Sequence, residues 1–492
     1  MNILFLPLDE RPCNYLYPQM IASSNTSIKL KMPSLNILSQ KKNPASFENI
    51  RTYLLEQAKN QEALVISLDM LLYGGLIPSR LHHLSQDILI DRLKVLKEIK
   101  QINPRIKIYA FECIMRCPQY NSSEEEPDYY EDHGYALFKK KYLEDKKERE
   151  SLTDEEELER TSLSVPKDIL EDYEQRRHIN CMMNRNTLKY LEEGIIDFLV
   201  IPQDDSSPFG YTAIDQKLIL KEIKDKHLEF KVMVYPGADE VGLSLMTRAY
   251  NDYYHIQPKI YPFYASALGP SIVPLYEDRP MLESLKSHIL VTGAKLVMDE
   301  SKANIILAIN CPGKIMQESF DKKKDVSYSS YRQLMSFVQS IKDYIEEGKC
   351  VGVIDSAYAN GGDLELIHYL DHYNLLEELQ GYAGWNTNCN TTGTVLSEIQ
   401  LGMIHAPNTV YRLIEDVFYQ AKVRQQVIEN DLPELGLSYY DFKDKEEVVE
   451  KRIGEALLKE YNTLNISHKY PIDSIEVSMP WHRMFEIGMK LK

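Results

Sequence analysis

The sequence has no excess of positive charge and no long apolar run, and each absence argues against a class of protein. Its 492 residues carry a formal net charge of −17. Nucleic acids and anionic membranes are bound by basic faces, so neither is expected as a partner. No segment reaches the ~20 apolar residues of a membrane span. The N-terminus also lacks the basic start and the apolar stretch of a signal peptide. We therefore expect a cytoplasmic protein.

Signatures of metal and nucleotide binding are also missing. The seven cysteines form no CxxC pair, and Cys113 and Cys117 have no second pair or nearby histidine to complete a zinc site. Neither Gly-x-Gly-x-x-Gly nor a Walker A sequence occurs, which argues against a nucleotide-dependent enzyme. We expect reduced thiols, no metal ligands and no cofactor.

What the chain does contain is an alternation of short apolar runs and helical stretches. Hydrophobic residues make up 43% and charged residues 27% of the chain, which is ordinary for a globular protein. Strands are predicted at residues 3–8, 63–68, 106–111, 199–201, 231–235, 259–264, 303–309 and 350–354. Such βα units predict an α/β fold with parallel strands. Their number favours a (β/α)8-like barrel over residues 1–390, and two Rossmann-like domains are the alternative.

Two regions depart from this alternation. Residues 121–180 contain charge runs such as Glu124-Glu125-Glu126 and few β-formers, which predicts a helical insertion with solvated faces. Residues 391–492 are predicted to form a helical C-terminal region with no obvious set of strands.

Acidic or amide side chains follow almost every predicted strand. In a barrel, the loops at the carboxyl ends of the strands surround one concave site at one end of the barrel. Clustered carboxylates repel one another, so they require arginines, a metal or a polyhydroxylated ligand, and Arg80 and Arg116 lie in the same loops. Carboxylates, amides and aromatic rings around a concave site suit a saccharide. The residues expected to bind it are Asp9, Arg11, Asp69, Asp239, Glu240, Asp355, Asn360, Trp385 and Asn386.

The central candidates are Asp204 and Asp205, which follow the apolar run Leu199–Ile201 and open a Ser/Pro/Gly turn. We expect them to be the catalytic pair. They could instead cap the next helix, and Asp239 with Glu240 could do the same. Trp385 could stack beneath a sugar ring or pack in the core.

Several long segments resemble one bacterial family of unknown function, the family numbered 4127. They are DERP at Asp9, SLDMLLYGGLIPSR at Ser67, PQDDSSPFG at Pro202, YPGADEVGL at Tyr235, PLYEDRP at Pro274 and AGWNTNCNTTGT at Ala383. The resemblance extends over nearly the whole chain and implies no particular activity.

A second, local resemblance does imply one. The stretch GIIDFLVIPQDDS at Gly194, together with Trp385-Asn386, is similar to the O-GlcNAc hydrolase family. In that family the acetamido oxygen of the substrate is the nucleophile. The resemblance implies that Asp204 orients the acetamido group and that Asp205 is the general acid/base. The N-terminal glycine-rich signature of those enzymes is absent, and Asp9-Glu10-Arg11 stands in its place.

Three functions are therefore carried forward. The first is a glycoside hydrolase acting on an N-acetylhexosamine-containing or related saccharide. The second is a divalent-metal-dependent hydrolase or lyase that uses the acidic strand ends as oxygen ligands. The third is a non-catalytic protein that binds sugars or polar metabolites.

Overall fold

The computed structural model describes residues 1–402 and 406–492, and the chain divides into two compact units. Unit 1 comprises Met1–Glu10, Ile28–Leu245 and Tyr276–Asp278, and unit 2 comprises Arg11–Ser27, Met246–Leu275 and Arg279–Lys492.

Unit 1 is built on a six-stranded sheet in which all strand pairs are parallel. The strands are β1 (Asn2–Leu6), β2 (Lys29–Lys31), β3 (Ala63–Ser67), β4 (Lys107–Phe111), β5 (Phe198–Gln203) and β6 (Val232–Pro236). Their order across the sheet is β2-β1-β3-β4-β5-β6, so the first strand lies between the second and the third. This order is one of the two common orders of open, doubly wound α/β sheets, in which ligands bind beyond the carboxyl ends of the strands.

The central strands are buried on both faces, which explains why they appear in the sequence as continuous apolar runs. Every residue of β3 and of β5 is buried. Parallel strands covered by helices on both sides lose the polar–apolar alternation of a half-exposed strand. The apolar run before Asp204 therefore marks a central strand, as predicted.

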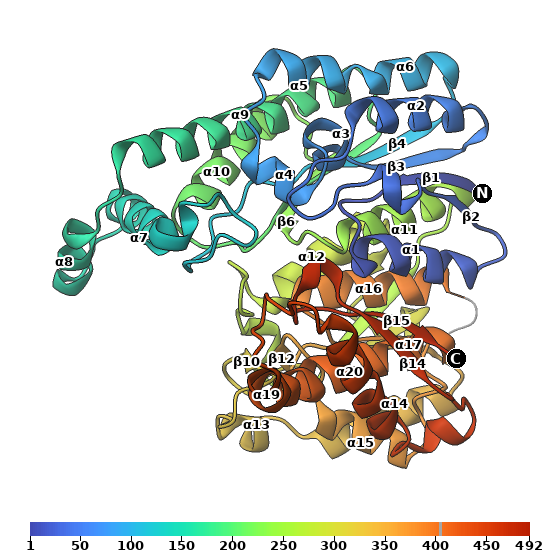
Figure 1. The fold of residues 1–492 in the computed structure, drawn as a ribbon. Helices are drawn as coiled ribbons and strands as arrows, with labels where there is room; N and C mark the ends of the chain where they lie inside the picture. The colour runs from blue at the N-terminus through green and yellow to red at the C-terminus, as the bar shows by residue number, and fades with distance from the viewer. Residues whose placement is uncertain (403–405) are drawn as a thin grey trace. The chain divides into compact units, whose positions relative to one another are not determined.

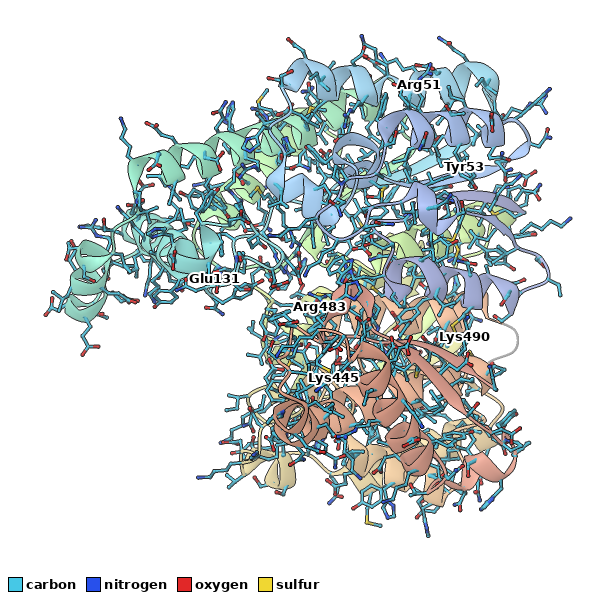
Figure 2. The ribbon with its side chains drawn as sticks, viewed as in Figure 1. Arg51, Tyr53, Glu131, Lys445, Arg483 and Lys490 are labelled. Atoms are coloured by element: carbon cyan, nitrogen blue, oxygen red, sulfur yellow. The ribbon has the colours of Figure 1, made fainter. Side chains whose placement is uncertain are left out.

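Helices connect these strands, and Figure 1 shows α2, α5 and α6 along one side of the sheet. The helices that lie wholly in unit 1 are α2 (Phe47–Gln57), α3 (Leu68–Tyr73), α4 (Leu76–Leu81), α5 (Gln86–Leu93), α6 (Val95–Ile102), α7 (Tyr130–Arg149), α8 (Asp154–Ser162), α9 (Lys167–Glu192) and α10 (Tyr211–Asp225). Arg51 on α2, which is labelled in Figure 2, pairs with Glu98 on α6. In the part of the chain that the structure describes, no helix is both long and apolar enough to cross a membrane.

The predicted insertion at residues 121–180 is helical, and it packs on the body of unit 1. Tyr130, Leu137 and Tyr173 form one buried cluster with Met115 and Cys117 from the loop after β4. This loop is therefore held between the sheet and the helices that follow it.

Unit 2 contains a second parallel sheet with the same arrangement of its first strands. Its strands are β7 (Lys259–Tyr264), β8 (Lys295–Leu296), β9 (Ile305–Asn310), β11 (Cys350–Asp355) and β13 (Gly381–Ala383), in the order β13-β11-β9-β7-β8. Again the first strand lies between the second and the third. Two small pairs accompany this sheet, the parallel β10 (Gln317–Glu318) with β12 (Tyr358–Ala359) and the antiparallel β14 (Ile475–Ser478) with β15 (Gly488–Leu491).

The remaining helices belong mainly to unit 2. They are α1 (Pro12–Ser23), α11 (Val241–Tyr254), whose first turns belong to unit 1, α12 (Met281–Val291), α13 (Ser327–Ser330), α14 (Leu334–Glu346), α15 (Leu364–His372), α16 (Asn388–Leu401), α17 (Ala406–Arg412), α18 (Arg424–Gln426), α19 (Leu432–Leu435) and α20 (Glu446–Tyr461). Two π-helices, η5 (Leu413–Val423) and η6 (Val427–Asp431), flank α18.

Two sequence-based expectations require correction, the closed barrel and the absence of strands in the C-terminal region. The strands form two separate open sheets rather than one closed eight-stranded barrel, so the barrel is wrong and the arrangement is consistent with the alternative of two Rossmann-like domains. Unit 2 includes residues on both sides of position 390, namely 279–402 and 406–492. The C-terminal region is mostly helical, but it also contributes β14 and β15.

Candidate functional site

The carboxyl ends of the unit 1 strands bring several of the predicted acids to one edge of the sheet. Asp69 follows β3, Asp204 and Asp205 follow β5, and Asp239 follows β6. The charges of Asp69, Asp204 and Asp239 all contribute to raising the pKa of the Cys113 thiol, after burial as the main cause, so these carboxylates surround a common region. Parallel strands have this consequence because all of their carboxyl ends point the same way.

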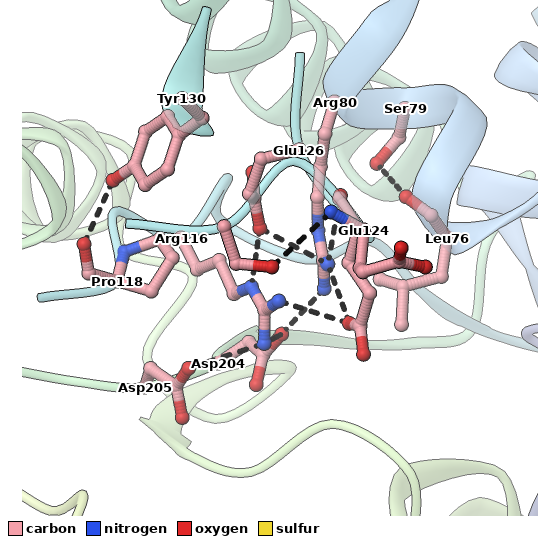
Figure 3. Close-up of polar contacts among 12 residues, drawn as sticks. Leu76, Ser79, Arg80, Arg116, Pro118, Glu124, Glu126, Tyr130, Asp204 and Asp205 are labelled. Atoms are coloured by element: carbon pink, nitrogen blue, oxygen red, sulfur yellow. Dashed lines mark hydrogen bonds and ion pairs between the residues drawn. The ribbon is translucent and has the colours of Figure 1, made fainter. Parts of the chain in front are cut away.

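Two buried arginines organise this edge. Arg80, at the end of α4, donates from Nη2 to Asp204 Oδ2 at 2.8 Å, and from Nη1 to Glu125 Oε2 at 3.2 Å and to Glu126 Oε1 at 3.3 Å (Figure 3). Its side chain is only 2% exposed. A guanidinium in this position fixes one oxygen of Asp204 and so limits the orientations of that carboxylate.

Arg116, in the loop after β4, completes the arrangement. Its Nε donates to Glu126 Oε1 at 2.8 Å, its Nη1 to Asp205 Oδ2 at 3.1 Å and its Nη2 to Glu125 Oε2 at 2.9 Å. Arg80 and Arg116 therefore share Glu125 and Glu126, and Arg116 pairs with Asp205 and, at 3.8 Å, also with the Asp204 that Arg80 holds. Figure 3 shows the two arginines between Glu126 and the two aspartates. We call these six side chains, Arg80, Arg116, Glu125, Glu126, Asp204 and Asp205, the Arg–Asp cluster.

The glycine pair before α4 explains how Arg80 reaches the cluster. Gly74 and Gly75 have φ values of +87° and +136°, which residues with a side chain rarely adopt. A Cβ on Gly74 would also lie 2.8 Å from the backbone nitrogen of Ala45. The turn that joins α3 to α4 therefore depends on glycine at this position, and the turn sets the direction of the helix that carries Arg80.

Glu125 and Glu126 are the members of the cluster that sequence reasoning missed. The run Glu124-Glu125-Glu126 was expected on a solvated face, but Glu126 is completely buried. A signal was present in the sequence, because this run follows closely on Arg116 within the same loop region. Only the fold shows that Arg80 approaches the same carboxylates.

The two aspartates of the cluster differ in environment. Burial, followed by the negative charge of Asp204, raises the pKa of Asp205 to about 6, although Arg116 and Arg80 act in the opposite direction. Asp205 also adopts a left-handed backbone conformation with φ of +46°, which is uncommon outside glycine. A carboxyl group with such a pKa can hold and release a proton near neutral pH.

The cluster presents acceptors to solvent and keeps its donors inside. The side chains of Asp204 and Asp205 are 19% and 26% exposed, whereas those of Arg80 and Arg116 are 2% and 10% exposed. The cluster also contains only two positively charged groups, the guanidinium groups of Arg80 and Arg116. Its four carboxyl groups are those of Glu125, Glu126, Asp204 and Asp205. An anionic ligand such as a phosphate would meet net negative charge, so the site favours a neutral or cationic ligand that donates hydrogen bonds.

A deeper pair of acids lies behind the cluster. Asp69 accepts a hydrogen bond from the Cys113 backbone N–H at 3.0 Å, and burial raises its pKa to about 7. Burial and the charge of Asp69 raise the pKa of Glu112 well above its ordinary value. Both side chains are almost fully buried. Burial therefore favours the protonated form of Glu112, which is not among the residues expected to bind a saccharide.

The second sheet has its own polar edge, which is closed. Asp355 accepts hydrogen bonds from Asn310 Nδ2 at 2.8 Å, from the Asp363 backbone N–H at 2.7 Å and from the Tyr382 hydroxyl at 2.8 Å. Arg332 contacts Asp363 and donates to Asn310 Oδ1 at 3.0 Å. All five side chains are buried, so this network stabilises unit 2 and offers solvent no free carboxylate.

The other predicted residues of unit 2 also have structural partners. The Arg11 guanidinium lies 4.5 Å above the Trp481 ring. Asn360 donates from Nδ2 to Glu318 Oε2 at 2.9 Å, and its backbone N–H donates to the Asn386 carbonyl at 2.7 Å. Trp385 is only 7% exposed and donates from its indole nitrogen to Thr394 Oγ1 at 3.1 Å. Trp385 therefore packs in the core and presents no stacking face.

The predicted site residues come from both units. Asp9, Asp69, Asp204, Asp205, Asp239 and Glu240 belong to unit 1, whereas Arg11, Asp355, Asn360, Trp385 and Asn386 belong to unit 2. Glu240 is fully buried and accepts a hydrogen bond from the Ala238 backbone N–H at 3.0 Å, which fits a structural role. Within residues 1–402 and 406–492, no three His, Cys, Asp or Glu side chains are placed to hold a metal ion.

Glu398, a buried acid in unit 2, allows the effect of burial on a carboxyl pKa to be tested. Burial raises the pKa of Glu398, whose Oε2 accepts the Tyr382 backbone N–H at 3.0 Å, to about 8. The unfolded chain releases this proton near pH ~4.3. Between about pH 4.3 and about pH 8, the folded state therefore holds a proton on Glu398 that the unfolded state has released. The stability of the fold falls as the pH rises through this range. Glu398→Gln should remove this part of the fall.

The measurement is the free energy of unfolding in denaturant at several values between about pH 5 and about pH 8. Glu455→Gln is the matched control, because Glu455 is 69% exposed in the same unit and should leave the pH dependence unchanged. If the stability of the Glu398→Gln variant depended on pH in the same way as that of the wild type, the raised pKa of Glu398 would be contradicted.

The chain belongs to the family described as "Protein of unknown function (DUF4127)", whose model matches residues 3–490. The predicted resemblance to this family is therefore confirmed. Among curated proteins none matches the sequence, and the local similarity to the O-GlcNAc hydrolases is not supported by any such match.

Proposed function

We propose that this protein is a glycoside hydrolase, acting on an N-acetylhexosamine-containing or related saccharide. Asp205 acts as the general acid/base, and Asp204 orients the group next to the reacting carbon. The proposal rests on one observation above all: two adjacent carboxyl groups at the carboxyl edge of a parallel sheet are held by two buried arginines in different surroundings. Asp204 pairs with Arg80 at 2.8 Å, while the pKa of Asp205 is raised to about 6.

Such a difference is what acid/base chemistry with two carboxyl groups requires. A general acid must keep its proton until the leaving oxygen needs it, whereas its partner must remain a charged hydrogen-bond acceptor. In substrate-assisted hydrolysis the partner accepts a hydrogen bond from the acetamido N–H and so positions the acetamido oxygen for attack. The fixed Asp204 suits this second role, and the more exposed Asp205 suits the first.

The polarity of the cluster supports a sugar as the substrate. The exposed groups accept hydrogen bonds, and the hydroxyl groups of a saccharide donate them. A phosphorylated substrate is disfavoured by the excess of carboxylates over arginines. A metal-dependent hydrolase has less support, because Arg80 and Arg116 each bind the Oδ2 atom of one of these aspartates, and because the described residues place no three acids, histidines or cysteines to hold an ion.

The test is a screen of chromogenic glycosides, including N-acetylhexosaminides, followed by a pH profile with the best substrate. Because Asp205 must be protonated to donate its proton, kcat/KM should fall as the pH rises above about 6. Cleavage of no glycoside in the panel, or a kcat/KM that increases steadily through this range, would contradict the proposal. Saturable sugar binding without turnover would instead identify a non-catalytic binding protein.

A further inference from the structure

Tyr120 lies in the loop between β4 and α7 and is joined to the Arg–Asp cluster by one guanidinium. Arg116 Nη2 donates to the Tyr120 hydroxyl oxygen at 2.8 Å, while Nη1 of the same group donates to Asp205 Oδ2 at 3.1 Å. The two nitrogens belong to one rigid planar fork. The Tyr120 hydroxyl and the Asp205 carboxylate are therefore fixed side by side.

The backbone around Tyr120 is anchored on both sides. The Tyr130 hydroxyl donates to the Pro118 carbonyl at 2.8 Å (Figure 3), and the Tyr135 backbone N–H donates to Asn121 Oδ1 at 2.8 Å. Gly134 permits a close contact with α7, because a Cβ there would lie 2.4 Å from the Tyr120 carbonyl oxygen. The loop is thus held against α7 at a position where alanine would not fit.

Although its backbone and hydroxyl are held, the residue is 41% exposed. Burial raises the pKa of the Tyr120 hydroxyl, against the charge of Arg116 and together with the charges of Glu125, Glu126 and Asp205, so the hydroxyl end lies within the cluster. An exposed tyrosine is common on protein surfaces and by itself indicates nothing. This one differs because its orientation is set by the arginine that also holds Asp205.

We propose that Tyr120 is the aromatic platform on which a pyranose ring stacks when its glycosidic oxygen reaches Asp205. This inference rests on the proposed function and adds a substrate-binding residue to it. The face of an aromatic ring carries partial negative charge, and the C–H groups on one face of a sugar carry partial positive charge. Stacking on Tyr120 would leave the sugar hydroxyls free to donate to Asp204 and Asp205.

The orientation of the ring reduces the cost of binding. A platform that is already held by its hydroxyl and by its backbone loses little conformational freedom when a ligand arrives. The sequence pattern suggested Trp385 for this role, but that indole is buried in unit 2. Tyr120 is an exposed aromatic ring in contact with the proposed catalytic cluster.

The experiment separates stacking from a purely structural role in holding Arg116. Tyr120→Phe removes the hydroxyl and keeps the ring face, whereas Tyr120→Leu removes the ring face and keeps apolar bulk. The probe is methyl N-acetyl-β-glucosaminide, titrated into the full-length protein and followed by NMR. We expect Tyr120→Phe to bind within about twofold of wild type and Tyr120→Leu to bind about tenfold more weakly.

Phe230→Ala is the matched control, because Phe230 is an exposed aromatic residue at the amino end of β6, the opposite edge of the sheet. Equal losses of affinity in Tyr120→Phe and Tyr120→Leu would show that Tyr120 acts through Arg116 and would overturn the inference. Unchanged affinity in Tyr120→Leu would overturn it as well.

Failure of the proposed function has a different outcome. If wild type binds the probe but cleaves no glycoside, the hydrolase proposal fails. The affinities of Tyr120→Phe and Tyr120→Leu for the probe still show whether the sugar stacks on Tyr120. If the probe does not bind to wild type at up to about tens of millimolar, the platform is overturned for this sugar class, and the chromogenic screen decides the hydrolase independently.

Discussion

Replacing Asp205 with asparagine should lower kcat/KM for the best glycoside substrate by about 10²–10⁴-fold. Asparagine has nearly the same shape and can still accept a hydrogen bond from Arg116 Nη1, which lies 3.1 Å from Asp205 Oδ2. What it cannot do is donate an acidic proton to the departing oxygen. The loss should therefore appear mainly in kcat, and binding of the methyl glycoside should change little.

The leaving group distinguishes the two aspartates. A dinitrophenolate leaves without protonation, so a dinitrophenyl glycoside should restore much of the activity of Asp205→Asn but little of that of Asp204→Asn. Asp225→Asn, at the exposed end of α10, is the control and should retain wild-type activity. Equal activity of Asp205→Asn and wild type on a substrate with a poor leaving group would remove Asp205 from the mechanism.

Replacing Arg80 with methionine should destabilise the protein by about 3–5 kcal/mol, the cost of removing one partner from a buried ion pair. Methionine preserves much of the apolar stem of Arg80, so the loss reflects the missing charge and hydrogen bonds rather than a cavity. Asp204 would lose its 2.8 Å partner, and the buried Glu126 would keep only Arg116. The measurement is the free energy of unfolding in denaturant near neutral pH.

Arg51→Met provides the comparison within the same unit. Arg51 pairs with Glu98 on the helical surface, and the two side chains are 37% and 35% exposed. Exposed pairs contribute about 0–1 kcal/mol, so this variant should be nearly as stable as wild type. Similar small losses in both variants would mean that water replaces Arg80 without cost and that the cluster is not a buried charge network.

The parts of the fold that could be predicted are those that depend on residues close together in the sequence. All eight predicted strands overlap an observed one, namely β1, β3, β4, β5, β6, β7, β9 and β11, because each is an apolar run long enough to be distinguished from its surroundings. The two-residue strands β8, β10 and β12 were not predicted, because so short a segment has no hydrophobic period and forms only when a neighbouring backbone is in place.

The candidate site was predicted only in part for a related reason. Asp204 and Asp205 were identified because they follow a buried strand directly. Glu126 was assigned to a solvated face, since nothing near it in sequence shows that Arg80, 46 residues away, donates to it. Nothing near Tyr120 in the sequence distinguishes it from other tyrosines, because its proposed role depends on sharing Arg116 with Asp205.

The sequence by itself determined that the chain has parallel βα units, that its strand ends are acidic and that it belongs to its family. These features depend on residues close to one another in the chain or on the order of motifs along it. The tertiary structure decided that the strands form two open sheets, because continuous apolar runs are compatible with any parallel sheet buried on both faces. The tertiary structure also decided which acids lie close together. As a result, Asp205 is partly exposed beside Asp204, which Arg80 holds, whereas Asp355 is buried. Burial and the positions of Arg80 and Arg116 control that difference, and both arise only when segments distant in sequence pack together.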